Sequence, residues 1–158
     1  MAKENKYTEE LSAAMEKANP VLSFDDAFKG IPYNKIHERP NGLPYSIWEL
    51  ATHLCIAQHT YLHTAKDPNF KSPKWPDEFW PTEKNPSEKE WNQCLKDIHD
   101  DNEEWTKLVR EKGDKLFEPL AHAGGVSTFD LALKSARHSS YHAGEVVVVR
   151  RLLGIWKK

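Results

Sequence analysis

Prolines gathered in two segments constrain the fold of this chain more than any other feature. The first segment contains Pro32, Pro40 and Pro44, and the second, residues 66–86, contains Pro68, Pro73, Pro76, Pro81 and Pro86. Proline lacks the amide hydrogen of a helical hydrogen bond, and its ring collides with the preceding turn. Both segments are therefore predicted to be loops, and long helices are expected only outside them.

The stretches outside these loops have helical periodicity and recognisable helix starts. Ser46, Ser87 and Ser127 stand at N-cap positions, and Glu90 follows Ser87 with the spacing of a capping box. Apolar residues after Ser46 and after Ser127 recur at the intervals of one helix face. We therefore expect helices over residues 8–18, 47–64, 88–112 and 128–153, and a short helical piece over 23–29.

The last of these helices contains a conflict, because four consecutive valines at 146–149 favour a strand locally. The apolar positions on either side keep helical spacing, so a helix is predicted through the valines. The expected fold is all-α, an antiparallel four-helix bundle with long proline-rich connections. The 158 residues fit one domain, 1–158.

Composition argues against several classes of partner. The formal net charge is −2, from 22 basic and 24 acidic residues without a block of like charge, so no nucleic-acid surface is expected. No apolar run is long enough to span a membrane, so no membrane association is expected either. The N-terminal stretch lacks the apolar segment of a signal peptide, and two cysteines fit a reducing compartment. A cytoplasmic location is therefore expected.

Two histidine pairs have the spacing with which a helix can hold a metal ion: His59 with His63, and His138 with His142. At about 100° per residue, His138 and His142 share the sector of Leu131, which is expected to face the core. His59 and His63 fall on the opposite side of their helix from its apolar stripe. They are interpreted as surface histidines.

The inward pair, His138 and His142, has two interpretations that stay open: hydrogen-bonded core histidines or metal ligands. His53 lies at the inward edge of the second long helix, so three histidines from two helices can meet. Three protein ligands leave coordination positions open, as catalytic metal sites do. Glu145, one turn beyond His142, is a candidate to orient a ligand ring or to act as a base. His122, in the loop before the last helix, is a weaker candidate to overhang the site.

The motifs around these histidines resemble the DinB/YfiT-like superfamily. The family typically has a pattern like S-I-W-E-L-x-x-H in its second helix, which is "SIWELATH" here, residues 46–53. It ends with a pattern like H-x-x-Y-H-x-G-[QE]-[IV]-x-x-x-R-R-x-L-G, which is "HSSYHAGEVVVVRRLLG" here, residues 138–154. The resemblance implies a four-helix bundle in which His53, His138 and His142 coordinate a divalent transition metal such as Zn or Ni. It also implies a frequent homodimer.

Three hypotheses about function follow. Characterised members of the resembled family are mostly thiol-dependent transferases or isomerases, and others are regarded as metal-dependent hydrolases. The first hypothesis is therefore a metal-dependent enzyme that transfers a low-molecular-weight thiol to an electrophilic substrate, or a related hydrolase. The alternative is a non-catalytic metal-binding bundle that acts in a stress response through partners. In a third hypothesis the histidines bind no ion and form a hydrogen-bonded core.

Overall fold

The structure, a computed structural model, describes residues 6–19 and 22–156, and most of its regular structure is helical. Its α-helices are α1 (Lys6–Glu16), α2 (Phe24–Phe28), α3 (Ile47–Lys66), α4 (Glu88–Lys112) and α5 (Thr128–Leu152). Short 3-10 turns lie in the connections, at Tyr33–Lys35, Asp77–Phe79, Gly113–Phe117 and Ala121–Ala123. The predicted all-α class is confirmed. Within the described part of the chain, no helix is both long and apolar enough to cross a membrane.

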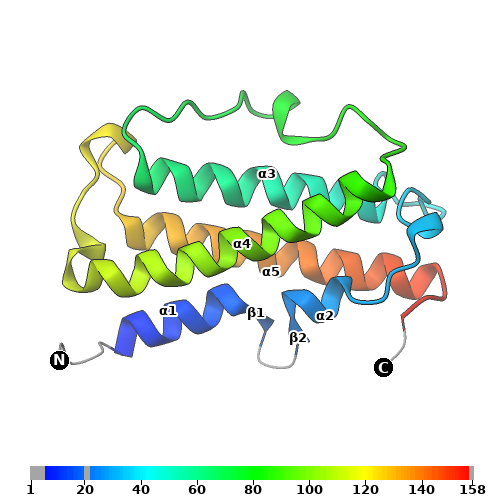
Figure 1. The fold of residues 1–158 in the computed structure, drawn as a ribbon, viewed down its shortest axis with the longest axis horizontal. Coiled ribbons are helices and arrows are strands. Elements are labelled where there is room, and N and C mark those ends of the chain that lie inside the picture. The colour runs from blue at the N-terminus through cyan, green and yellow to red at the C-terminus, as the bar shows by residue number, and fades with distance from the viewer. Residues whose placement is uncertain (1–5, 20–21, 157–158) are drawn as a thin grey trace.

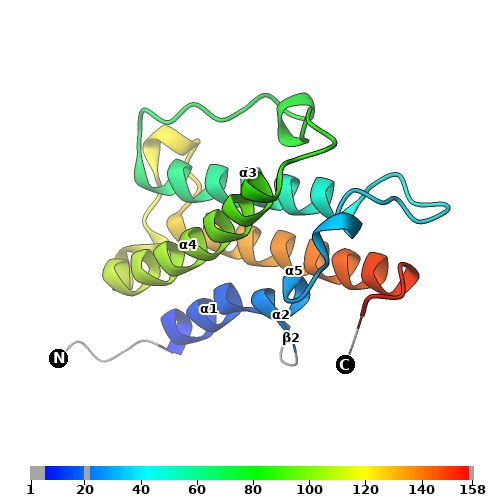
Figure 2. The same cartoon turned by 45° about the vertical axis from the view of Figure 1, so that its right-hand side comes forward.

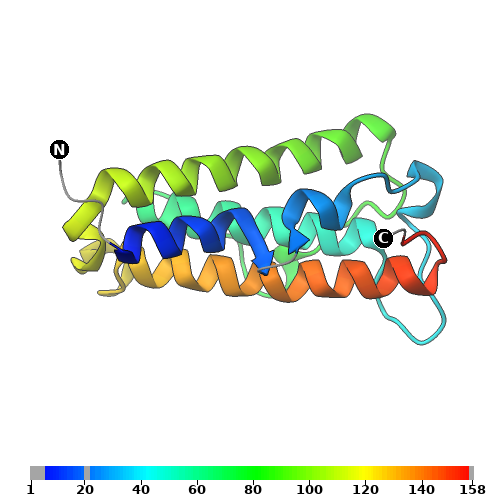
Figure 3. The ribbon, with the colours of Figure 1, turned by 90° about the horizontal axis from the view of Figure 1, so that it is seen from below.

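The helices α1, α3, α4 and α5 run side by side along the length of the molecule (Figures 1 and 3). Helix α3 packs against α5 and α4, and α1 packs against α4 and α5. The proline-rich connection from α3 to α4 returns along the outer side of α3 (Figures 1 and 2). Both long loops are where the prolines predict them.

All three predicted serine caps are present. Ser46, Ser87 and Ser127 each accept a hydrogen bond from the backbone three residues later, and the side chain of that third residue accepts one from the serine backbone. Such reciprocal capping boxes satisfy amide groups that a helix start otherwise leaves without partners. The caps fix the first turns of α3, α4 and α5.

The N-terminal part differs from the sequence prediction. The first helix ends at Glu16 instead of residue 18, because the backbone of β1 (Lys17–Asn19) pairs in antiparallel fashion with β2 (Leu22–Ser23). This strand pair was not predicted, and it separates α1 from α2. The valine run, in contrast, is helical as predicted, since α5 continues to Leu152.

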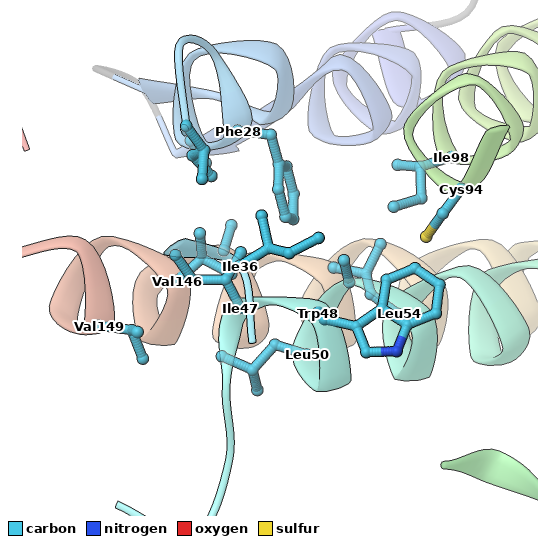
Figure 4. Packing of buried hydrophobic residues seen from close by; sticks show 14 of the residues in the cluster. Phe28, Ile36, Ile47, Trp48, Leu50, Leu54, Cys94, Ile98, Val146 and Val149 are labelled. Carbon is cyan, nitrogen blue, oxygen red and sulfur yellow. The ribbon is translucent and has the colours of Figure 1, made fainter. Parts of the chain in front are cut away.

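The core consists of two apolar clusters that follow one another along the helices. One contains Leu50 and Leu54 of α3 with Val146 and Val149 of α5, and is drawn in Figure 4. The other contains Leu62 and Ala65 of α3 with Leu131 and Ala136 of α5, around the fully buried Trp105 of α4. His138 therefore lies between the two clusters along α5. A polar site at this junction interrupts neither cluster.

Candidate metal centre

The three histidines predicted as ligands, His53, His138 and His142, lie together between α3 and α5. The Nε2 atom of His138 is 3.1 Å from Nε2 of His53 and 3.1 Å from Nε2 of His142. His53 and His142 are buried, and His138 is partly buried. The rings contact one another, with centroids 4.4 to 5.0 Å apart. The angular argument from the sequence therefore placed all three correctly.

The opposite nitrogens of two of these rings have fixed partners. Nδ1 of His53 is 2.8 Å from the backbone carbonyl oxygen of Phe79, and Nδ1 of His142 is 2.7 Å from Oε2 of Glu145. A carbonyl oxygen and a carboxylate can only accept, so each Nδ1 carries the proton and donates. In the neutral form of either ring, Nε2 is then unprotonated, and its lone pair is available toward Nε2 of His138, 3.1 Å away.

If all three rings are neutral, two Nε2–Nε2 contacts would have to share a single proton, so the histidines cannot form two complete hydrogen bonds with one another. Neutral His138 can place at most one proton on Nε2, and that proton lies between two acceptors, the Nε2 atoms of His53 and His142. A single cation would instead accept all three lone pairs. Tetrahedral zinc with bonds of ~2.0–2.1 Å places two ligand nitrogens about 3.3 Å apart, close to the 3.1 Å separations here. The donor set fits a divalent transition metal.

The electrostatics of the site favour the neutral form of His53 and of His138. Burial lowers the pKa of His53, and burial followed by the neighbouring His142 and His53 lowers the pKa of His138 to about 4. An imidazole must be neutral to donate to a metal. At neutral pH the site is therefore ready to bind a cation without first losing protons from these two rings.

Glu145 connects the histidines to two tyrosines. Its Oε2 accepts from His142, and its Oε1 accepts a 2.9 Å hydrogen bond from the hydroxyl of Tyr45, in the loop before α3. Burial and then this bond raise the pKa of Tyr45 to about 12, so its hydroxyl stays protonated and donates. Exposed Tyr141 also interacts with Glu145, whose charge raises the pKa of Tyr141. These contacts fit the ring-orienting function predicted for Glu145.

The proline-rich loop covers His53. The sequence did not predict which residues of the loop contact this histidine. The ring of Trp80 stacks on His53 at 4.1 Å between centroids with 9° between planes, beside the carbonyl of Phe79. The sequence indicated only that a loop with four aromatic side chains, Phe70, Trp75, Phe79 and Trp80, packs on the body of the protein. No spacing rule identifies which of them reaches His53.

An open pocket of about 320 Å³ lies beside His138. It is lined by His138 with Tyr61 of α3 and by Lys134, Arg137 and Tyr141 of α5. The two cationic side chains give its rim a positive charge. A small anionic molecule can therefore approach His138 from this side.

His122 is placed at another point of the fold. Its Nε2 lies 2.8 Å from the backbone oxygen of Thr64, and its side chain is exposed. Thr64 follows His53 by 11 residues, or about 16 Å along α3. The contact of His122 anchors the loop before α5 to the end of α3. Its predicted overhang of the site gains no support from these contacts and stays a prediction.

The cysteines lie apart from the histidine cluster. Cys55 and Cys94 are free thiols, and their hydrogen bond followed by burial raises the pKa of the Cys55 thiol. A raised pKa disfavours the thiolate that a nucleophile or metal ligand requires. The chemistry of the site therefore rests on the histidines and Glu145.

Comparison with known families agrees with this arrangement. Residues 23–146 match the model of the DinB superfamily, which covers the short α2 and extends into α5 past all three histidines. No curated protein and no solved structure matches the chain. The match thus spans most of the sequence.

Proposed function

The chain belongs to the DinB superfamily, and on this premise we propose that it is a metal-dependent enzyme whose divalent ion is held by His53, His138 and His142. The observation that carries the proposal is the convergence of three imidazole nitrogens, one from each histidine, within 4.8 Å of one another. Such a group is compatible with a metal-binding protein. We propose zinc or nickel because both accept imidazole nitrogen readily.

The reaction we propose is transfer of a low-molecular-weight thiol to an electrophilic carbon, with hydrolysis as the related alternative. When bound, the ion supplies Lewis acidity that favours the deprotonated form of a thiol or a water molecule. Three protein ligands would leave room for such a molecule. The electrophile would then meet a nucleophile already held in place, which lowers the entropic part of the barrier.

The side chains around the histidines would perform the remaining tasks. Glu145 accepts the hydrogen bond from Nδ1 of His142, which leaves the lone pair of Nε2 available to bind the metal. Tyr45 fixes the second oxygen of Glu145, which limits rotation of the carboxylate. Trp80 and the carbonyl of Phe79 hold the His53 ring in one orientation and shield it from water.

The pocket beside His138 supports a thiol that carries a negative charge. Lys134 and Arg137 line this pocket, and Tyr61 and Tyr141 provide aromatic walls. Cationic side chains attract carboxylate groups, and an arginine can bind a carboxylate through two parallel hydrogen bonds. We therefore propose an anionic thiol cosubstrate that enters along this face of α5.

The test combines elemental analysis with an activity panel. Tag-free wild type, His138→Ala and His99→Ala are purified; His99 is an exposed histidine of α4 with acidic neighbours and serves as the matched control. Each is assayed with several anionic and neutral thiols against alkylating electrophiles and with ester and amide substrates. Wild type and His99→Ala should contain metal and show thiol-dependent turnover, and His138→Ala should lose the turnover together with the ion of the three-histidine centre.

Two results would contradict the proposal. If His138→Ala keeps full activity without metal, the three histidines are not the catalytic centre. If wild type contains metal but the whole panel shows no turnover, the non-catalytic metal-binding bundle becomes the better description. Wild type without any metal affinity would favour the hydrogen-bonded histidine core.

A further inference from the structure

The second histidine pair, His59 and His63, does not lie on a plain solvated surface. Both rings project from α3 toward α4, where they meet Asp101, and their ligand atoms lie within 4.8 Å of one another. The two rings are 4.0 Å apart between centroids. The sequence interpretation as surface histidines is right about the exposure of His59, whose side chain is 51% exposed, but it missed the carboxylate on the neighbouring helix.

Asp101 is the residue that distinguishes this cluster from an ordinary surface group. It is 92% buried, since only 8% of its surface is exposed. Its Oδ2 atom is shielded from solvent and accepts no hydrogen bond from any residue that the structure describes. Nδ1 of His59 lies 3.5 Å from this oxygen, beyond the roughly 2.7–3.2 Å of a good hydrogen bond.

A buried carboxylate oxygen without a partner is costly, because it has lost its water and gained nothing in return. Burial accordingly raises the pKa of Asp101 to about 6. A cation bound between Oδ2 and the two imidazoles would supply the missing partner. The 3.5 Å between Oδ2 and Nδ1 of His59 already approaches the separation of two ligands on one ion.

The cluster opens into a cavity of about 730 Å³. This cavity is lined by His59 and Asp101, by two further acids of α4, Asp97 and Asp100, and by part of the proline-rich loop including Phe70 and Lys71. Acids outnumber the single lysine on this lining, so the cavity favours a cation over an anion. The rings of Phe70 and His63 lie 5.6 Å apart between centroids, so the proline-rich loop packs against the cluster.

The geometry points to a second metal site, formed by His59, His63 and Asp101, that binds a first-row divalent transition ion. Two imidazole nitrogens and one carboxylate oxygen suit zinc, cobalt or nickel better than calcium or magnesium, which prefer oxygen ligands alone. The site is independent of the three-histidine centre, because His59 and His63 contact α4 whereas His53 contacts α5. One loop nevertheless reaches both places, through Phe70 here and Trp80 there.

The two sites can be separated by removing one of them. In His138→Ala the three-histidine centre is disabled while His59, His63 and Asp101 remain. Tag-free, full-length His138→Ala, stripped with a chelator and titrated with Co²⁺ and then Zn²⁺, should bind one ion per chain. Calorimetry gives the stoichiometry, and the visible absorption of Co²⁺ reports a site with nitrogen ligands.

Variants in the same background identify the ligands. Adding His59→Ala or Asp101→Asn should weaken Zn²⁺ binding by more than the roughly 10- to 100-fold that the loss of an outer partner costs. Adding His99→Ala, which removes another histidine with acidic neighbours, should leave it unchanged. Asp101→Asn keeps the shape of the buried side chain. If this variant does not fold, His59→Ala still tests the ligand assignment, because the side chain of His59 is half exposed and its removal disturbs the fold little.

The outcomes also separate this inference from the proposed function. If wild type binds one ion and His138→Ala binds none, the second site does not exist, while the three-histidine centre stands. If His138→Ala binds one ion but His59→Ala weakens it no more than His99→Ala, the ion is held elsewhere and the assignment is wrong. If His138→Ala binds one ion that His59→Ala abolishes, the second site is established whatever the enzyme assays show.

Discussion

The pairs His138/His142 and His59/His63 have the same spacing on a helix, yet their surroundings differ. His138 and His142 meet a third histidine, and the ring of His142 is oriented by Glu145. His59 and His63 meet a carboxylate and one aromatic ring, and half of the His59 side chain is in solvent. Spacing alone therefore identifies helices that can reach a cation from one face. The facing helix decides which donor completes the set.

The difference also bears on how each site would bind. In the three-histidine centre, His53 and His142 have their Nδ1 protons fixed by Phe79 and Glu145, so the donor atoms are set before an ion arrives. Among the residues that the structure describes, no hydrogen-bond partner fixes the ring of His59, whose Nδ1 lies 3.5 Å from Asp101. We therefore expect the three-histidine centre to bind the same ion more tightly, and the following variants test that order.

The largest effect is expected from His138→Ala. Removing this ring takes away the one nitrogen that contacts both of the others, so tight metal binding and turnover at the three-histidine centre should be lost. Elemental analysis after gel filtration and the thiol-transfer assay measure the two losses. In wild-type background, His59→Ala should leave turnover within about twofold, since His59 belongs to a group of ligand atoms separate from the three-histidine centre. Equal losses of turnover in His138→Ala and His59→Ala would contradict the assignment of catalysis to the three-histidine centre alone.

The second largest effect is expected from Glu145→Gln. Glutamine keeps the size of the side chain but removes the charge that holds the Nδ1 proton of His142. Metal affinity at the three-histidine centre should fall by about 10- to 100-fold, as for other outer partners of histidine ligands. Competition with a chromophoric chelator measures it. In a His138→Ala background, metal binding reports only the site of His59 and His63. Glu145→Gln should leave that binding unchanged.

A third prediction concerns pH and the metal-free protein. The pKa of His138 is lowered to about 4 in the folded chain against an ordinary value of 6.5, so between these pH values the unfolded chain binds more protons. Stability from this group is therefore present above pH 6.5 and is lost as the pH falls toward 4. Urea unfolding in the presence of a chelator measures the loss.

The difference between wild type and His138→Ala isolates this contribution, because Asp101 and the other acids titrate in both proteins. The decline of stability from pH 6.5 to 4 should be shallower in His138→Ala and unchanged in His99→Ala. Parallel curves for wild type and His138→Ala would mean that His138 is solvated when the metal is absent.

The smallest effect is expected from Tyr45→Phe. The substitution removes the hydrogen bond to Oε1 of Glu145, a loss of about 1 kcal/mol, or roughly fivefold in metal affinity. Tyr141→Phe is the matched control, because Tyr141 faces the same carboxylate but is 64% exposed and should matter less. A stronger effect from Tyr141 than from Tyr45 would mean that Glu145 is oriented from the solvent side.

Much of the fold could be predicted from local rules. Proline placement located both long loops, and three serine caps located the starts of α3, α4 and α5, because a cap acts within four residues of its own helix. The strand pair between α1 and α2 could not be predicted in this way, since two and three residues carry almost no periodicity. A two-stranded pair of that length depends on the surrounding helices for its stability.

In the candidate site, too, residues on helices could be predicted from the sequence, and residues on loops could not. The helical angle assigned His53, His138 and His142 to the core side, because an apolar stripe must face the interior wherever the helix packs. Trp80, the carbonyl of Phe79 and Tyr45 were not assigned, because they reach the histidines from loops whose paths no periodicity describes.

The sequence by itself therefore determined the long helices, the serine caps of three of them, their buried faces and the three inward histidines, all of which depend on neighbours within one or two helical turns. Only the tertiary structure decided which groups from distant segments meet them. It put the proline-rich loop over His53, Tyr45 against Glu145 and the buried Asp101 beside His59. The physical reason is that helical order arises from local hydrogen bonds, whereas contacts between segments depend on how the whole chain packs.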